Sequence, residues 1–577
     1  MQSVHWILGL NHGPHDSSAA LLRNGRLVVI AEQERFSRAK RALDQPPTQA
    51  MEYCLNYAGV SLGELESIAL GFDFALMRKW LGIDAAQAQQ ELPFDDPDRL
   101  FPPAIFGAGE RPPVKVIRHH TAHAASTFWA SGFADAAVLV ADDMGEAVST
   151  TLGYGSADGF SVTEIYPVAQ SLGMYYSRAA RYAGLYSRSS EVGKLMGLAA
   201  YGRPEQPVPL SARDGRYQFT GLPPMSDDLP GSTIRRERSS QLLAFFERHC
   251  YPYARGLSAD VMSYASFAAS VQAALEGALL ELVREQRRRT GSRNLAMAGG
   301  VALNCTANGL LVRDAGYDNV FIQPMAGDSG VALGAAMAAH AESHGAGTLD
   351  VRMEHACYGP SYGQDEILAA LEAQDVAFRR YPEPELVAHV AELIDRGRVV
   401  GWYQGRAEIG PRALGARSLL GDPRRRETLV RLNQIKGREM WRPIAPSVLA
   451  SEWQRYFTGS RPDPFMIVAA SVRPARRAEI PAVVHVDGSA RPQAVSPRVL
   501  TRFAALIGEF DRRTGVPVLA NTSFNLQDEP IVNTPADAVS TYLRGQLDAL
   551  AIGDCLAIRA ESERSGDPDP SAAHSWW

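Results

Sequence analysis

The sequence predicts an α/β protein of two domains, and three observations lead to this prediction. First, the chain has 577 residues, which is too long for one hydrophobic core and predicts two large domains or three to four small ones. Second, a pattern of three strands followed by helices occurs twice in the N-terminal half. Third, residues 343–363 have the composition of a linker, after which helix and strand signals alternate again. The expected parts are domains 1–345 and 363–560, a linker at 346–362 and a tail at 561–577.

The duplicated pattern consists of apolar segments separated by turns. In the first copy, Asn24-Gly25 is the signal of a two-residue hairpin turn between apolar segments. In both copies a polar, Gly-containing loop follows the first strand, at 11–18 and 142–146. Two related α/β halves account for the repeat, and a coincidence between two hairpins is the alternative. The expected strands are 6–10, 19–22 and 27–31, then 137–141, 150–154 and 162–166.

The C-terminal domain is expected to be α/β because its helix and strand signals alternate. Apolar residues between Leu386 and Ile394 recur at i, i+4, i+7 and i+8, which predicts a helix. Gly397 ends that helix, and the apolar segment 399–403 is typical of a strand. Thr534, followed by Pro and then by Asp at the third helical position, predicts the start of another helix.

Composition excludes several classes of protein. Hydrophobic residues make up 46% of the chain and charged residues 21%, which excludes disordered and fibrous proteins. The net charge of −6 argues against non-specific binding to nucleic acid. Five cysteines without C-x-x-C spacing indicate reduced thiols. Because we find no signal-peptide pattern and no run of about 18 uninterrupted apolar residues, we expect a cytoplasmic protein without a membrane span.

One motif has the spacing of metal ligands. His119 and His123 stand four residues apart, so on a helix both imidazoles face the same side and can reach one ion. Asp142 ends an apolar strand, and Asp328 lies in a Gly-flanked loop before a helix. Two His with one or two Asp suit Fe²⁺, Mn²⁺ or Zn²⁺ better than Mg²⁺. Two histidines on a helix surface are the alternative interpretation.

Two glycine-containing segments could approach a phosphate. Gly299 and Gly300 follow a short strand, where a backbone without side chains can approach a ligand, and Asn304 stands where a helix begins. Lys194 lies in a Gly-Lys-Leu-Met-Gly segment that lacks the spacing of a phosphate-binding P-loop but could face an anion. A simple strand-to-helix turn and a solvated lysine are the alternatives.

A strongly basic segment is the most informative feature. Residues 406–442 hold nine arginines and one lysine against four acids, a charge of +6 within a chain of −6. These cations are spread over Gly/Pro loops, which indicates a site for a small polyanion such as ATP or an acyl phosphate. A solvated basic face and nucleic-acid binding are the alternatives. The candidate residues are Arg412, Arg417, Lys436, Arg438 and Arg442 here, and Asn521, Ser523 and Asn525 in a later Asn-Thr-Ser-Phe-Asn segment that suits ribose or phosphate, or an ordinary turn.

Seven motifs in one order carry a resemblance to a known family. They are G-L-N-H-G-P-H-D-S-S-A-A at 9–20, H-H-T-A-H-A-A-S at 119–126, the segment 193–202, G-G-V-A-L-N at 299–304, G-P-R-A-L-G-A-R-S at 410–418, I-K-G-R-E-M-W-R-P-I-A-P at 435–446 and N-T-S-F-N at 521–525. The chain resembles the O-carbamoyltransferases of natural-product biosynthesis over about residues 5–558. The resemblance implies a duplicated actin-like (ASKHA) N-terminal domain and a YrdC-like C-terminal domain.

The resemblance also implies two reactions. The YrdC-like domain makes carbamoyl-adenylate from carbamoyl phosphate and ATP with Mg²⁺, and the N-terminal domain transfers the carbamoyl group to a hydroxyl. By matching positions, the residues that hold carbamoyl phosphate and ATP are Arg412, Lys436, Arg442, Arg491, Ser523 and Asn525, with Arg417, Arg438 and Asn521 beside them. The nucleotide contacts of the N-terminal domain are Gly299, Gly300 and Asn304, with Lys194 as a further candidate.

For the transfer step, the resemblance implies a metal, iron in the family, at His119, His123, Asp142 and Asp328. His15, beside Asp16, is the candidate for hydroxyl activation, and a capping or packing histidine is the alternative. Two departures from the family pattern stand out. Gly13 replaces an acid of some members, and Asp143 replaces the usual glycine.

The expected partners are carbamoyl phosphate, ATP and a small hydroxyl acceptor such as an antibiotic sugar or core, and we also consider a homodimer. Nucleic acid and membrane are not expected as partners. Two alternative functions are a threonylcarbamoyl-type tRNA-modifying enzyme and a non-catalytic nucleotide-binding ASKHA module. The net charge of −6 argues against the first, and the basic cluster together with the metal-type spacing argues against the second.

Overall fold

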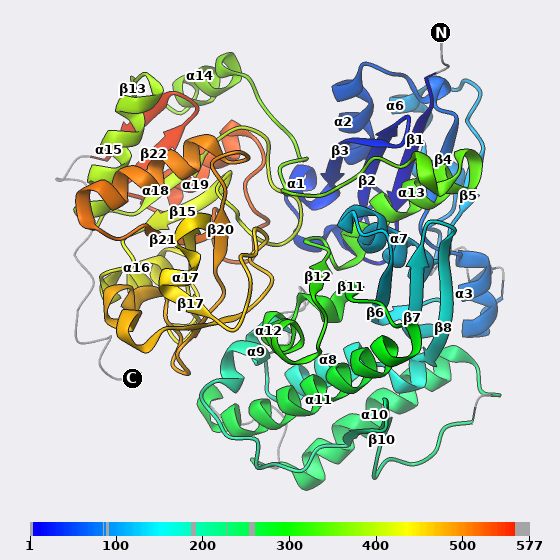
Figure 1. Cartoon of the computed structure of the whole chain (residues 1–577). Coiled ribbons are helices and arrows are strands. Elements are labelled where there is room, and N and C mark those ends of the chain that lie inside the picture. The colour runs from blue at the N-terminus through cyan, green and yellow to red at the C-terminus, as the bar shows by residue number, and fades with distance from the viewer. Residues whose placement is uncertain are drawn as a thin grey trace. The chain divides into compact units, whose positions relative to one another are not determined.

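The computed structural model describes residues 4–84, 86–87, 90, 92–185, 192–226, 228–252 and 260–559. The chain forms two compact units, Met1–Met353 and Glu354–Trp577, and each is described here by itself (Figure 1). The tail expected at 561–577 lies outside the described residues.

The first sheet of unit 1 has five strands in the order β3-β2-β1-β4-β5. The first three strands form an antiparallel meander, and β1 and β4 then pair in parallel, as do β4 and β5. The predicted turn at Asn24-Gly25 is confirmed, because both residues have positive φ and Arg23 pairs with Arg26 across it. The strands are β1 (Trp6–Asn11), β2 (Ser18–Arg23), β3 (Arg26–Glu32), β4 (Ser67–Leu70) and β5 (Val114–Val116).

The second sheet repeats this topology. Its order is β8-β7-β6-β11-β12, again an antiparallel meander of three strands joined to two parallel strands. Unit 1 is therefore a duplicated α/β fold, as the repeated strand pattern predicted. The strands are β6 (Ala136–Gly145), β7 (Val148–Ser156), β8 (Gly159–Pro167), β11 (Asn294–Ala298) and β12 (Asn319–Ile322).

The end of β6 differs from the sequence prediction. Residues 142–146 were expected to form a loop, but the strand continues to Gly145, which pairs with Val148 after an irregular stretch that begins at Ala141. A strand that continues through a local irregularity can redirect a side chain without ending the sheet. Asp142 therefore stands on a strand end that the sheet holds in place.

Two helices, one from each half, pack against each other and against the sheets. Helix α7 (His119–Ser131) contacts β6 and β11, and α13 (Val331–His344) contacts β1, β2 and β4. Helix α13 is rich in alanine, so its backbone can approach both α7 and the first sheet closely. This packing brings the loop before α13 to the start of α7 (Figure 1).

The other longer helices of unit 1 are α2 (Thr48–Ala58), α3 (Phe74–Leu81), α8 (Leu172–Tyr182), α9 (Gly193–Ala199), α10 (Gly231–His249), α11 (Ala265–Thr290) and α12 (Cys305–Asp314). Of these, α2 packs on the first sheet, α8 and α11 pack on the second, and the rest pack mainly on other helices. The segment Val261–Thr290 is long and apolar enough to cross a membrane by length and composition. Most of its apolar window, 61%, is buried inside the protein, as in the core helix of a globular domain.

Unit 2 is built on an eight-stranded mixed sheet in the order β13-β23-β22-β14-β15-β21-β16-β20. Its strands are β13 (Arg379–Arg380), β14 (Val400–Tyr403), β15 (Arg417–Gly421), β16 (Ala445–Leu449), β20 (Gln493–Val495), β21 (Val518–Ser523), β22 (Ala549–Ile552) and β23 (Cys555–Ile558). Its longer helices are α14 (Gln364–Glu372), α15 (Glu383–Asp395), α16 (Arg426–Ile435), α18 (Thr501–Thr514) and α19 (Pro535–Arg544).

Local signals in unit 2 were read correctly from the sequence. Leu386 and Ile394 are buried on α15, and β14 follows that helix. Thr534 is the N-cap of α19 and forms a capping box with Asp537. The α/β class of this unit is therefore confirmed.

Candidate functional site

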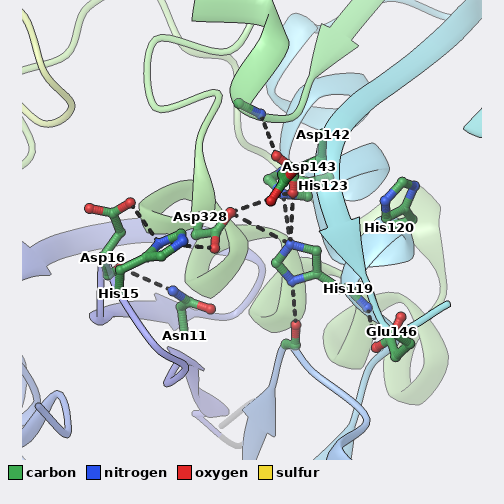
Figure 2. A network of polar contacts seen from close by, with 12 residues as sticks. Asn11, His15, Asp16, His119, His120, His123, Asp142, Asp143, Glu146 and Asp328 are labelled. Carbon is green, nitrogen blue, oxygen red and sulfur yellow. Dashed lines mark hydrogen bonds and ion pairs between the residues drawn. The ribbon is translucent and has the colours of Figure 1, made fainter. Parts of the chain in front are cut away.

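Two histidines and two aspartates meet in unit 1 (Figure 2). His119 Nε2 lies 3.4 Å from Asp142 Oδ2 and 3.6 Å from Asp328 Oδ1, and His123 Nε2 lies 3.7 Å and 3.8 Å from the same two atoms. The four ligand atoms all lie within 4.8 Å of one another. We call this group the His/Asp cluster.

The backbone of neighbouring segments fixes the orientation of His119. Its Nδ1 lies 3.2 Å from the carbonyl oxygen of Gly71, which can only accept a hydrogen bond. Nδ1 therefore carries the proton, and in the neutral imidazole Nε2 keeps a lone pair that points into the cluster. The buried Glu146 accepts the backbone N–H of His119 at 3.0 Å and so anchors the first residue of α7.

The environment shifts the charges of the cluster toward opposite signs. Burial opposes the charged form of His119, but its hydrogen bonds to Asp142 and Asp328 outweigh this effect and raise the pKa of the imidazole well above its usual value. Burial also opposes ionisation of Asp142, yet both histidines hold the pKa of that carboxyl well below its usual range. The pKa of Asp328 is lowered as well, because His15 and the two histidines outweigh burial and the nearby Asp142.

The donor set fits a divalent cation. Two imidazole nitrogens and two carboxylate oxygens are the ligands that Zn²⁺, Fe²⁺ and Mn²⁺ use in proteins. The Nε2 atoms of His119 and His123 lie 3.1 Å apart, so their lone pairs repel unless a proton or a cation lies between them. Asp142 is further fixed by Gly300, whose N–H donates to Oδ1 at 2.9 Å and leaves Oδ2 for the cluster.

His15 and Asp16 lie beside the cluster. His15 Nδ1 is 3.0 Å from Asp16 Oδ2 and 3.4 Å from Asp328 Oδ2. Burial lowers the pKa of His15, but the nearby Asp328 and Asp16 outweigh burial and raise it. Asp16 also pairs with Arg41 at 2.8 Å, which orients its carboxylate. The structure thus places the predicted hydroxyl-activating pair next to the predicted metal ligands.

The glycine pair lies close to the cluster, and its neighbours have structural contacts. Gly299 has φ +91°, and a side chain there would collide with the carbonyl of Ala141. Asn304 caps α12 and exchanges hydrogen bonds with Gln272, so its amide is occupied by the protein. Lys194 is half-buried on α9, which touches the start of α12. Their contact with a nucleotide stays a prediction.

In unit 2, three predicted residues from distant parts of the sequence meet. Lys436 is buried, and its Nζ lies 2.7 Å from the carbonyl oxygen and 3.0 Å from Oγ of Ser523. The same Nζ lies 2.7 Å from Oδ1 and 3.0 Å from the carbonyl oxygen of Asn525. The ammonium therefore holds the segment after β21 in one conformation.

In a second group of unit 2, three arginines lie close together. Burial, together with the charges of Arg442 and Arg491, lowers the pKa of Arg438 to about 9, and Glu439 offsets only part of this. Arg438 Nε donates to Asn433 Oδ1 at 2.6 Å, whereas its buried Nη2 has no hydrogen-bond partner among the described residues. Such a group favours an anion, because an anion would satisfy both the donor and the charge. We call Arg438, Arg442 and Arg491 the arginine cluster.

Arg417 and Asn521 have different surroundings from those that the sequence suggested. The guanidinium of Arg417 is fully buried, stacks 3.6 Å from the ring centroid of Tyr403, and donates to the carbonyls of Gln404 and Gly405. Asn521 is also buried and donates to Ser447 Oγ at 2.9 Å. Arg412 lies in the loop next to Ala413, whose carbonyl contacts the same Asn521 amide. Binding of a cofactor by these residues stays a prediction.

Sequence reasoning missed the residues that hold the site together. Glu146 and the carbonyl of Gly71 position His119, and Arg41 positions Asp16, but isolated residues of this kind have no motif. Glu408, buried in unit 2, accepts the N–H groups of Leu414 and Arg417 and so shapes the predicted Gly/Pro loop. In the sequence, only the position of Glu408 within the basic segment could have pointed to this role.

Two family models match the chain. The model described as Carbamoyltransferase N-terminus matches residues 6–84 and 104–337, and the model described as Carbamoyltransferase C-terminus matches residues 391–559. The first match contains the His/Asp cluster, and the second contains the basic segment and the arginine cluster.

Individual relatives agree with these matches. The chain is 34% identical to an uncharacterized protein of Synechocystis, over 97% of this chain and 98% of the relative. It is 37% identical to the nodulation protein NolNO of Sinorhizobium fredii, over 94% of this chain and 78% of the relative. Full-length HypF aligns over 59% of this chain and 56% of its own with 12% identity and a TM-score of 0.32, a similarity too low to support a conclusion.

Proposed function

Since the chain belongs to the carbamoyltransferase family, we propose that this carbamoyltransferase makes carbamoyl-adenylate from carbamoyl phosphate and ATP and transfers the carbamoyl group to a hydroxyl of a small molecule. The observation that carries the proposal is the division of charged groups between the units. Unit 1 contains a buried set of cation ligands, and unit 2 contains a half-buried set of three arginines.

The first reaction balances in two steps. Water releases phosphate from carbamoyl phosphate, and the bond between the phosphorus and the carbamate oxygen breaks. That oxygen then attacks the α-phosphorus of ATP, a new O–P bond forms, and pyrophosphate leaves with its electron pair. Apart from water, every species in these two steps is an anion, so catalysis depends on positive groups that are already in place.

Unit 2 supplies these positive groups. The arginine cluster would neutralise the phosphate oxygens of carbamoyl phosphate and ATP, with Arg412 as a further cation and Mg²⁺ accompanying the ATP. Lys436 would act by fixing the segment of Ser523 and Asn525, whose polar groups would then be presented to the bound substrates. A fixed polar environment needs no reorganisation during the reaction.

Unit 1 would carry out the second reaction. There the acceptor oxygen attacks the carbamoyl carbon, and the bond between that carbon and the AMP oxygen breaks. Asp16 would hold the proton of His15 on Nδ1, so that Nε2 can accept the proton of the acceptor hydroxyl. A divalent cation held by His119, His123, Asp142 and Asp328 would supply positive charge to the phosphate of the leaving AMP.

The acceptor is proposed to be a hydroxyl of a secondary metabolite, such as an antibiotic sugar or core. The net charge of −6 argues against tRNA, whose phosphates require a basic surface. Metal identity is proposed as Fe²⁺, Mn²⁺ or Zn²⁺ on the donor set alone.

The first experiment measures exchange of labelled pyrophosphate into ATP, with and without carbamoyl phosphate and without any acceptor. We expect exchange that requires carbamoyl phosphate, accompanied by phosphate release. Lys436→Ala should abolish it, because the segment of Ser523 and Asn525 loses its anchor. Lys79→Ala, at an exposed position of α3, is the matched control and should retain full exchange. Absence of exchange in folded wild-type protein would contradict the adenylate mechanism.

A further inference from the structure

A second cluster of metal-ligating side chains lies in unit 1, apart from the His/Asp cluster. His5 Nδ1 is 2.8 Å from Glu66 Oε2, and His344 Nε2 is 2.9 Å from the same oxygen and 3.0 Å from Oε1. The two imidazole rings lie 4.4 Å apart at their centroids. One ligand atom from each of the three residues lies within 4.8 Å of the other two.

The three side chains come from segments that the fold already holds together. His5 precedes β1 and Glu66 precedes β4, and these strands run parallel, so both residues stand at the same end of the sheet. Backbone hydrogen bonds fix both positions, from Glu66 N to the carbonyl of Trp6 and between His5 and Asn24. His344 is the last residue of α13, which packs along the same strands (Figure 1).

The second cluster lies far from the His/Asp cluster. Asp328 comes just before α13, whereas His344 ends it, and the 14 residues of this helix span about 20 Å. Likewise, His15 follows the end of β1 and His5 precedes its start. The two groups therefore cannot share one ion.

We propose that His5, Glu66 and His344 form a second divalent-cation site, for Zn²⁺ or a cation of similar ligand preference. Two imidazoles and one carboxylate are a common protein ligand set for zinc, with water completing the tetrahedron. Bound there, the ion joins the start of β1, the start of β4 and the end of α13. Its role is structural, because it fixes the helix whose other end carries Asp328. The inference does not depend on the proposed function.

The test counts zinc ions bound to the full-length chain after chelation and equilibrium dialysis against Zn²⁺, by elemental analysis. We expect two ions per wild-type chain and one per chain in Glu66→Gln, which removes the carboxylate shared by both histidines. Zn²⁺ should also raise the thermal midpoint of Asp142→Asn, and the added Glu66→Gln change should remove that increase.

His340→Gln is the matched control. His340 lies one turn before His344 on the same helix, but its Nε2 bonds Thr348 Oγ1 at 2.9 Å and it does not belong to the ligand set. This variant should keep two ions. His344→Gln serves as the second test variant, with circular dichroism as the check on folding. Equal zinc counts in wild type and in folded Glu66→Gln or His344→Gln would overturn the proposal. The three side chains would then interact only through hydrogen bonds.

Discussion

The His/Asp cluster of unit 1 is largely buried and the arginine cluster of unit 2 is half-buried, and the charges of the two groups are organised in opposite ways. In unit 1 each aspartate faces two histidines: the aspartates raise the pKa of His119, and the two histidines lower the pKa of both carboxyls. In unit 2, Arg438 lies among like charges, which add to burial in lowering its pKa.

This contrast indicates the sign of the ligand charge that each cluster favours. With neutral imidazoles the His/Asp cluster carries two negative charges, so it favours a divalent cation. The arginine cluster carries three positive charges that Glu439 offsets only in part, so it favours a polyanion. The net charge of −6 for the whole chain reveals neither preference, because ligands respond to the local charge.

The substitution Asp142→Asn tests most directly whether the two clusters serve separate reactions. The asparagine oxygen can still accept from Gly300 N–H, but an NH₂ group replaces the oxygen that faces both Nε2 atoms. Carbamoyl transfer to an acceptor should fall by about 1,000-fold or more, since losing even an outer-shell partner of a metal site costs about 10–100-fold. Pyrophosphate exchange, which we assign to unit 2, should persist.

Asp158→Asn, at an exposed turn between β7 and β8, is the control and should affect neither reaction. If Asp142→Asn abolished exchange together with transfer in folded protein, the two clusters would not serve separate reactions.

Arg417→Met tests whether every cation of the basic segment binds substrate, as we propose for the arginine cluster, or whether some only stabilise the fold. Arg417 donates to buried carbonyls and stacks on Tyr403, so its loss leaves acceptors unpaired. The free energy of unfolding should fall by about 3 kcal/mol. Chemical unfolding measures this, with the exposed Arg213→Met as a neutral control. An unchanged stability with lost ATP binding would instead assign Arg417 to the substrate site.

The sequence predicted the fold well because its signals are local. Turn residues such as Asn24-Gly25, the apolar face of α15 and the capping box at Thr534 act within a few residues of one another. The repeated strand pattern also predicted the duplication, because the same order of elements folds into the same sheet topology in both halves of unit 1.

The site was predictable only where a motif exists. The spacing of His119 and His123 reveals two ligands, but Gly71 and Glu146, which orient His119, act through backbone atoms or single side chains. Likewise, the charge of residues 406–442 predicted an anion site without revealing that Arg417 faces carbonyls instead. Tertiary packing decides which cation of a basic segment faces a ligand.

Gly145→Ala should disturb the His/Asp cluster without changing any ligand. A Cβ at Gly145 would lie 2.5 Å from Cδ2 of His120 and 2.7 Å from Cδ2 of His119, so the imidazole must shift. Metal affinity should fall by about 10-fold to 100-fold, as for other changes that misorient a ligand. Isothermal titration measures the affinity. Gly277→Ala, which meets nothing within 4 Å on α11, should leave it unchanged, and equal affinities in both variants would contradict the orienting role of Gly145.

The smallest expected effect concerns Asp463, an acid that interacts with Arg491. Burial raises the pKa of Asp463 to about 6, although the N–H groups of Phe465 and Ile467 and the charge of Arg491 act in the other direction. The folded protein therefore keeps a proton that the unfolded chain releases near pH 4. Stability from this group is present below pH 4 and is lost as the pH rises to about 6.

Asp463 is half-buried and solvent screens part of its interactions, so we expect a loss of about 1–2 kcal/mol in the free energy of unfolding between pH 4 and pH 6.5. Asp463→Asn should remove this part of the pH dependence, as measured by urea unfolding of both proteins at each pH. If the two profiles were parallel, Asp463 would already be ionised at pH 4 and would neutralise Arg491. The arginine cluster would then be closer in its charge balance to the His/Asp cluster, and the contrast between the two regions would weaken.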